Sequence, residues 1–128
     1  MKRILVILAS VLAAVSLSSC NSEIENPIAH DFVGTWDLVQ TAITYSDGAV
    51  TTYTAPAGEY LIFTDNTISI YKEDKIVEHG SFKIENENLF FDGTIRWRVV
   101  TMSKRQMILS QSGLGLLVSD YQFTYNKR

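Results

Sequence analysis

The chain has 128 residues, a formal net charge of −3 and a single cysteine. This length suffices for one domain with its own core, and a lone cysteine excludes an intrachain disulfide. The mildly acidic balance disfavours nucleic acid and anionic lipid surfaces as electrostatic partners. All aromatic residues follow position 20, so the rest of the chain has the aromatic-rich composition that is typical of sheet proteins.

Residues 1–20 have the three-part plan of a secretory signal peptide. Lys2 and Arg3 give a positive start, residues 4–15 are an apolar run, and small residues precede Cys20. The apolar run is too short to form a membrane-spanning helix. We therefore expect residues 1–19 to be removed on export, which would change the formal net charge to −5.

The sequence Leu17-Ser18-Ser19-Cys20 resembles the lipobox of bacterial lipoproteins, in which an aliphatic residue and two small residues precede a cysteine. The resemblance implies that Cys20 is lipidated through its sulfur and acylated, for example with palmitate, on its new amino group. Several acyl chains would hold the protein at a membrane. Asn21 implies the outer membrane, on its periplasmic or its surface face. The alternative is a free thiol in a secreted protein without an anchor.

Residues 20–31 are mostly polar and contain Pro27, which interrupts regular structure. We interpret them as a tether that joins the lipid anchor to a folded domain over residues 32–128. The anchor makes the membrane the first expected partner of this domain.

The folded domain contains nine short segments with the alternation of half-buried strands. Turn residues separate them, among them Asp47-Gly48 and Asp92-Gly93. Because the connections are short, strands that are neighbours in sequence should pair antiparallel. This predicts an all-β fold, an antiparallel up-and-down β-barrel of about eight or nine short strands with little helix. The predicted strands cover residues 34–44, 49–54, 59–63, 67–71, 76–84, 88–91, 94–103, 106–111 and 118–126.

Alternation also predicts which side chains face the barrel interior. In the first strand it places Trp36, Leu38 and Ala42 on one side. The outward rows are mostly polar, with Ile62, Phe90 and Ile108 as apolar exceptions. The predicted inward set is Trp36, Leu38, Leu61, Phe63, Ile68, Ile70, Phe82, Ile84, Leu89, Phe91, Trp97, Val99, Met107, Leu109, Phe123 and Tyr125.

Gly34-Thr35-Trp36 opens the first strand. This opening and the strand layout resemble the lipocalin signature, and most closely the small lipocalin-like domains of bacterial envelope lipoproteins. In lipocalins the glycine closes one barrel end, the tryptophan plugs the floor, and a basic residue at the end of the last strand packs over the tryptophan. Lys127 and Arg128 are the candidates for that basic residue. The resemblance also implies a short helical turn, within residues 28–33, over the open end of the barrel.

Two functions remain open. A binding module would hold a small apolar ligand in the barrel mouth, with residues 114–117 as a lid. Its predicted ligand-binding residues are Trp36, Phe63, Phe82, Trp97 and Tyr125. The alternative is a protein-interaction module, for example an inhibitor, with a filled barrel and an outer face for an envelope or host protein. That face would include Tyr60, Tyr71, Phe90, Arg96 and Arg98.

The size of the interior distinguishes these functions. Sixteen mostly large inward side chains favour a filled or nearly filled barrel, whereas a cavity of roughly 300 Å³ or more would favour ligand binding.

No residue pattern predicts catalysis. His30 and His79 lack a second histidine or cysteine at metal-ligand spacing, and no phosphate-binding loop or nucleophile elbow is present in the sequence. We predict no enzymatic activity, no metal, no cofactor and no nucleic-acid partner, and we expect a monomer.

Overall fold

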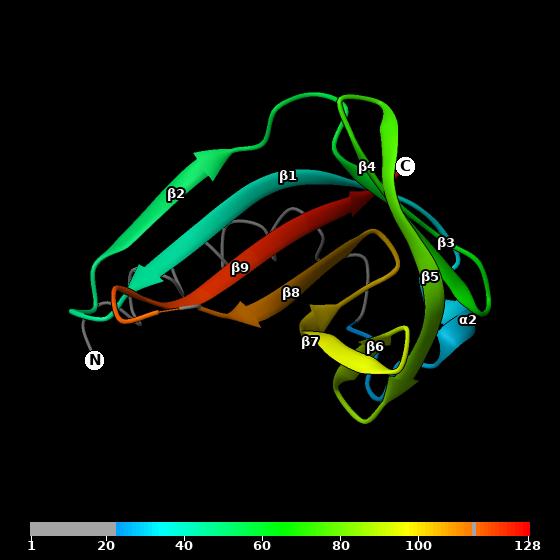
Figure 1. The fold of residues 1–128 in the computed structure, drawn as a ribbon. Coiled ribbons are helices and arrows are strands. Elements are labelled where there is room, and N and C mark those ends of the chain that lie inside the picture. Colours follow the sequence, from blue (N-terminus) through cyan, green and yellow to red (C-terminus); the bar gives the residue numbers. More distant parts are fainter. Residues whose placement is uncertain (1–22, 114) are drawn as a thin grey trace.

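A computed structural model describes residues 23–113 and 115–128, so the predicted signal peptide and the predicted lipidation of Cys20 lie outside the described residues. The described chain forms one antiparallel sheet, in which eight strands close into a barrel and one further strand lies beside it (Figure 1). The predicted fold class is therefore confirmed, and every predicted strand end lies within one residue of the observed end. The strands are β1 (Gly34–Tyr45), β2 (Val50–Thr54), β3 (Tyr60–Phe63), β4 (Thr67–Lys72), β5 (Lys75–Glu85), β6 (Asn88–Phe91), β7 (Thr94–Met102), β8 (Gln106–Ser112) and β9 (Val118–Lys127).

The barrel closes where β1 pairs with β9, from Trp36 opposite Lys127 to Tyr45 opposite Val118. The other edge of β1 is shared by two short strands: β3 pairs with residues 34–37 and β2 with residues 40–44. The predicted up-and-down order of strands is therefore wrong at one place, because β2 and β3 do not pair with each other within the described chain. The reason is the length of β1, which is long enough for two strands to lie along one edge in succession.

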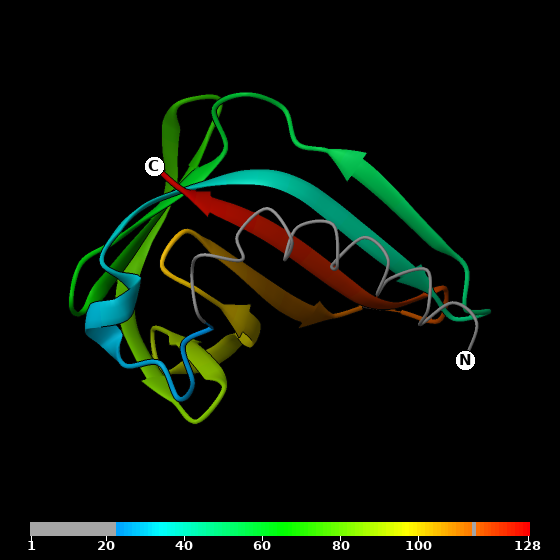
Figure 2. The same cartoon turned by 180° about the vertical axis from the view of Figure 1, so that it is seen from behind.

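Part of the sheet continues beyond the barrel, as Figures 1 and 2 show. We call this part the extension; it comprises residues 40–45 of β1, the whole of β2, residues 118–123 of β9 and residues 110–112 of β8. A bulge at Val39 shifts the register of β1 against β9, between Leu38 and Gln40. An inserted residue reverses which side chains face inward. Thr41 therefore shares the inner face with Leu38, and the prediction that placed Ala42 there was wrong.

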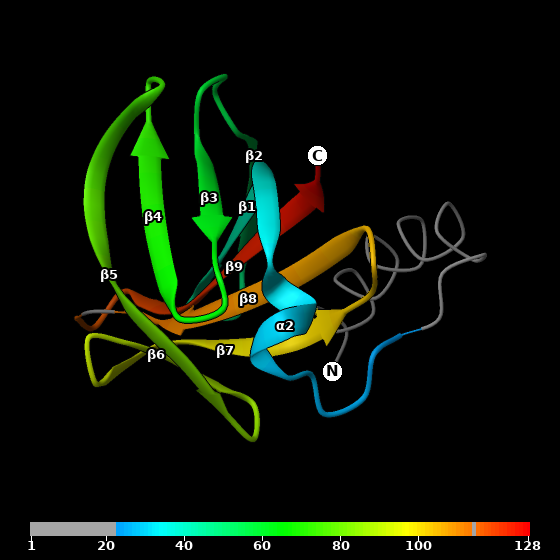
Figure 3. The same ribbon diagram turned by 90° about the vertical axis from the view of Figure 1, so that its right-hand side faces the viewer.

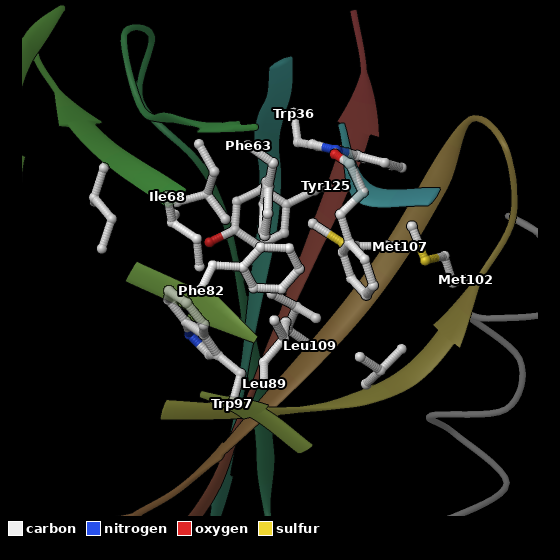
Figure 4. Close-up of a cluster of buried hydrophobic side chains, with 14 residues drawn as sticks. Trp36, Phe63, Ile68, Phe82, Leu89, Trp97, Met102, Met107, Leu109 and Tyr125 are labelled. Atoms are coloured by element: carbon white, nitrogen blue, oxygen red, sulfur yellow. The ribbon is translucent and has the colours of Figure 1, made fainter. Parts of the chain in front are cut away.

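The core fills the barrel and closely follows the predicted alternation (Figure 4). Twelve of the sixteen predicted inward residues are buried, and the other four are partly buried and pack against the same cluster. Met102 joins the core because a second bulge, at Val100, reverses the alternation near the end of β7. Ile108 was wrongly predicted to be exposed. It is 4 % exposed on the outer side of β8, which has neighbouring strands on both edges.

A short helix, α2 (Ala29–Phe32), lies across one end of the barrel, which we call the closed end (Figure 3). The predicted helical turn is thus confirmed, but it covers the end that contains Trp36 and not the open end, where it was predicted. Phe32 is fully buried, and its ring centroid lies 5.4 Å from those of both Phe63 and Phe82. Before the helix, the Ile24 N–H donates a 2.7 Å hydrogen bond to the Met102 carbonyl, and its side chain packs against the core. Across the described ranges, no helix is long and apolar enough to cross a membrane.

Candidate binding site at the barrel mouth

The closed end is organised around Trp36, which is fully buried. Its indole N–H donates a 2.8 Å hydrogen bond to the Phe32 carbonyl, so the tryptophan ties α2 to the barrel floor. The Lys127 ammonium lies 5.4 Å from the Trp36 ring centroid, a cation–π distance. Gly34 has φ +138°, and a Cβ there would lie 2.7 Å from Lys127 Cε. A larger residue at position 34 would therefore displace the lysine from the tryptophan.

Of the two predicted basic candidates, Lys127 is the one that covers Trp36. Arg128 instead pairs with Asp37, at 2.8 Å between Nη2 and Oδ1. Its guanidinium carbon also lies 4.7 Å from the centroid of the Tyr60 ring. The two consecutive basic residues thus have separate roles at the end of β9.

The five predicted ligand-binding residues all belong to the core, but they do not form one site. Trp36, Phe63 and Phe82 pack at the closed end, where the rings of Phe63 and Phe82 meet edge to face at 5.1 Å (Figure 4). Trp97 and Tyr125 line a cavity of about 150 Å³ at the opposite end, which we call the mouth. Any ligand in this cavity would therefore contact the second group.

The mouth cavity is smaller than the usual range for drug-sized ligands, which begins near 300 Å³. Leu38, Leu61 and Ile70 form its apolar floor. The barrel is thus nearly filled, as the sequence favoured. A cavity of about 150 Å³ still accommodates one small ring, because an engineered cavity of that size holds benzene.

Two largely buried side chains that carry a polar group line this cavity. Trp97 is 5 % exposed and Tyr125 is 6 % exposed, and both line the mouth. Within the two described ranges, neither the indole N–H nor the phenol hydroxyl has a hydrogen-bond partner, and neither is fully enclosed. Burial raises the pKa of Tyr125, and the negative charge of Glu59 raises it further. The hydroxyl therefore stays protonated and can donate a hydrogen bond to a ligand.

A bulge places Arg96 at the rim of the mouth. Leu89 lies opposite Trp97 and Phe90 lies opposite Ile95, so Arg96 is the extra residue between them. The prediction that Arg96 points outward was therefore wrong, because a bulged residue is turned away from the regular alternation. Its guanidinium carbon lies 5.2 Å from the Trp97 ring centroid.

Arg96 forms a bidentate ion pair with Glu78, at 3.0 and 2.8 Å. Glu78 lies opposite Ile70, so its carboxylate reaches the mouth from β5. The hydrogen bonds from Arg96 lower the pKa of Glu78, and partial burial opposes this shift. The pair holds the guanidinium in a fixed plane beside Trp97.

We expect this ion pair to make stability depend on pH. Because the folded-state pKa of Glu78 is lowered, its contribution is present above the unfolded pKa and is lost as the pH falls through the folded value. The effect should be small, because both side chains are about a third or more exposed. Urea unfolding midpoints measured from about pH 6 to pH 3 should fall more steeply in the natural protein than in Glu78→Gln. Glu87→Gln, outside the pair, should behave like the natural protein, and parallel curves for all three proteins would contradict the expectation.

Two tyrosines form the rest of the rim. Tyr60 of β3 lies opposite Tyr71 of β4, and their rings stack with centroids 4.6 Å apart and an interplanar angle of 13°. Both line the mouth cavity. Each lies next to a buried inward residue, Leu61 or Ile70, so both stay on the outer face as predicted, at the edge of the entrance.

Further aromatic side chains continue from the mouth along the inner face of the extension. Tyr53 and Phe123 both lie opposite Thr41, and Tyr121 lies opposite Ile43, so these rings share one face of the sheet. The rings of Tyr121 and Phe123 are parallel, with centroids 6.2 Å apart. Tyr45 follows Ile43 by two residues on the same face of β1, and its nearby hydroxyl raises the pKa of Tyr53. We call these four rings the aromatic shelf: Tyr45, Tyr53, Tyr121 and Phe123.

The shelf and the mouth form one surface, because Phe123 belongs to both. Sequence reasoning missed the shelf, although Tyr121, Phe123 and Tyr125 recur at every second position. That spacing is the signal that could have predicted an aromatic row along one face of β9.

The predicted lid does not cover the mouth. In its described part, the Leu116 and Leu117 carbonyls accept hydrogen bonds from the Ser46 side chain and backbone, respectively. The loop therefore lies beside the β1–β2 turn at the far tip of the extension (Figure 1). The prediction fails because β8 and β9 continue past the barrel before the chain turns. Leu114 lies outside the described residues.

Neither histidine lies in a metal-binding cluster. His30 Nδ1 lies 3.3 Å from the Asp65 carboxylate, and His79 Nδ1 lies 2.8 Å from the Ser69 hydroxyl. In the part of the chain that the structure describes, no three His, Cys, Asp or Glu side chains are grouped to hold a metal ion.

A scan against protein-family models, a search of curated proteins and a search of solved structures each found no match to this chain. The resemblance to lipocalin-like envelope lipoproteins therefore stays a prediction from the residues that carry it, as do the predictions about catalysis and partners.

Proposed function

We propose that this chain is a lipid-anchored protein of the cell envelope whose barrel binds one end of a small ligand at its mouth. The anchor is inferred from the signal-peptide plan and from Cys20 at the end of the lipobox-like sequence. The ligand site is inferred from one observation: Trp97 and Tyr125, whose side chains are at least nine-tenths buried and each carry a polar group, line the mouth cavity. Neither polar atom is fully enclosed, so each meets water in the free protein, and a ligand that offers hydrogen-bonding groups could take the place of that water.

The size of the cavity restricts what can enter. A volume of about 150 Å³ accommodates one ring or a short branched group, not a whole lipid. The rest of a ligand would lie on the aromatic shelf outside. This arrangement differs from an enclosed apolar site, because most of the ligand would remain in contact with water.

Binding of the neutral fluorescent aromatic amine N-phenyl-1-naphthylamine tests this proposal. We expect saturable fluorescence enhancement with the natural protein and at least a tenfold loss of affinity, about 1.4 kcal/mol, in Leu38→Phe. The larger side chain at position 38 would occupy the mouth cavity. Phe90→Ala, which removes an aromatic ring on β6 outside the mouth, is the matched control and should bind normally. Equal binding by all three proteins, or no saturable binding of either this amine or a neutral saccharide, would refute the ligand site.

The second candidate, a protein-interaction module, is favoured by a different observation. Leu116 is 91 % exposed and Leu117 is 79 % exposed, beside the turn that leads into β2. Exposed consecutive leucines often mark contact surfaces, and β2 has one unpaired edge within the described sheet. A protein that binds neither the aromatic amine nor a neutral saccharide would leave this candidate as the better one.

A further inference from the structure

We infer that the ligand of the mouth and the aromatic shelf is a neutral oligosaccharide. The inference rests on the proposed binding function and specifies its ligand class. It depends on three properties of the surface: balanced charge, flat exposed aromatic rings, and polar groups placed between them.

Charge around the mouth is balanced. Two acids and two bases line the cavity, Glu59 and Glu78 against Lys72 and Arg96. Arg96 and Glu78 neutralise each other directly through their bidentate pair. A site without excess charge gives no electrostatic preference for an anionic or a cationic ligand. A neutral ligand fits this surface best.

The aromatic rings are arranged for flat contact. On the shelf, Tyr121 lies parallel to Phe123, whereas the faces of Tyr60 are already covered by Tyr71 and Arg128. Tyr53 is 50 % exposed, so its ring is available to a ligand. One face of a pyranose ring carries only C–H groups, and this face packs on aromatic rings, whose faces are electron-rich. Flat rings along an open sheet are suited to a chain of such units.

Polar groups lie where sugar hydroxyls would need partners. The Tyr125 hydroxyl and the Trp97 indole N–H reach the cavity, and the Gln111 amide borders it. Planar side chains such as amides and guanidinium groups bind pairs of neighbouring hydroxyls through directed hydrogen bonds. An acyl chain would displace the water at these groups without replacing its hydrogen bonds, which costs free energy. The same lining that suits a saccharide therefore opposes a fatty acid.

The length of the surface favours more than one sugar unit. From Tyr125 at the mouth to Tyr121 on the shelf, β9 rises by about 13 Å. Only one ring fits inside the cavity, so the terminal unit would enter the mouth while the following units lie on the shelf. We therefore expect the protein to recognise the end of an oligosaccharide chain.

Isothermal titration calorimetry with maltohexaose, cellohexaose and mannohexaose, each up to about 5 mM, tests the inference. We expect at least one neutral hexaose to bind, and its affinity to fall about tenfold in both Tyr121→Ala and Tyr53→Ala. These two residues are only partly buried, so both variants should fold, which circular dichroism checks. Phe90→Ala, an aromatic substitution outside the site, should bind like the natural protein.

Three outcomes would overturn the inference: no hexaose binds, binding is unchanged in both shelf variants, or hexagalacturonate binds more tightly than every neutral hexaose. Failure here is distinguishable from failure of the proposed function. A protein that binds N-phenyl-1-naphthylamine but no hexaose has a ligand site of another class, whereas a protein that binds neither has no ligand site at the mouth.

Discussion

Replacing Trp36 with alanine is expected to lower the free energy of unfolding by about 3–5 kcal/mol, the usual cost of removing a buried aromatic side chain. Trp36 is fully buried between the barrel floor and α2. Its loss would leave a cavity, break the hydrogen bond to the Phe32 carbonyl and remove the ring beneath Lys127. Equilibrium urea unfolding of the purified protein measures the effect. A domain of this size is marginally stable, so the variant should be largely unfolded or close to it.

Two further variants show how much of the loss in unfolding free energy comes from the hydrogen bond of Trp36 and how specific the loss is to this position. Trp36→Phe keeps most of the apolar contact and removes the N–H donor, so it should cost less than the alanine variant. Ile95→Ala, at a position that is 53 % exposed, should change stability by no more than about 0.5 kcal/mol. A Trp36→Ala protein that loses less than about 1 kcal/mol would show that Trp36 does not hold the closed end together.

Replacing Cys20 with serine is expected to abolish acylation completely and to leave the leader uncut. The serine hydroxyl cannot form the thioether that the lipobox-like sequence implies, so no acyl chains would be attached. Because the leader of a lipoprotein is cut only after the cysteine is lipidated, residues 1–19 would stay on the variant. Triton X-114 partition of expressing cells, with mass spectrometry of the amino-terminal peptide, measures both the location and the modification.

The matched control is Ser22→Ala, which changes a neighbouring polar residue and leaves Leu17-Ser18-Ser19-Cys20 intact. This variant should remain in the detergent phase. Treatment with globomycin should cause the natural protein, but not Cys20→Ser, to accumulate as the lipoprotein precursor. An unmodified amino-terminal peptide in the natural protein, or acyl chains on the Cys20→Ser protein, would refute lipidation at this position.

The sequence predicted the strands well because two local signals agree. Alternating side chains identify each strand, and residues such as Asp92 and Gly93 mark the turns between them. Both turn residues have positive φ angles, of 52° and 83°, which explains why this pair ends β6. The contact between Lys127 and Trp36 was also predicted, because in the family that the sequence resembles a basic residue at the end of the last strand packs over this tryptophan.

The mouth was only partly predictable, because bulges leave no clear mark in a sequence. One inserted residue at Val39 moves Thr41, in place of Ala42, to the inner face. Another insertion turns Arg96 toward Trp97 and Glu78. Alternation alone treats each strand as regular, so it assigned these side chains to the wrong face. The pairing of β2 and β3 along the same edge of β1 also depends on tertiary structure, which no local pattern records.

The docking of Ile24 against Met102 determines how the protein would be oriented at a bilayer. Cys20 precedes Ile24 by four residues, and a fully extended chain of that length spans at most about 14 Å. An acylated Cys20 would therefore hold the closed end near the lipid headgroups. The opening between Trp97 and Tyr125 would point away from the membrane surface, toward the aqueous compartment from which soluble molecules arrive.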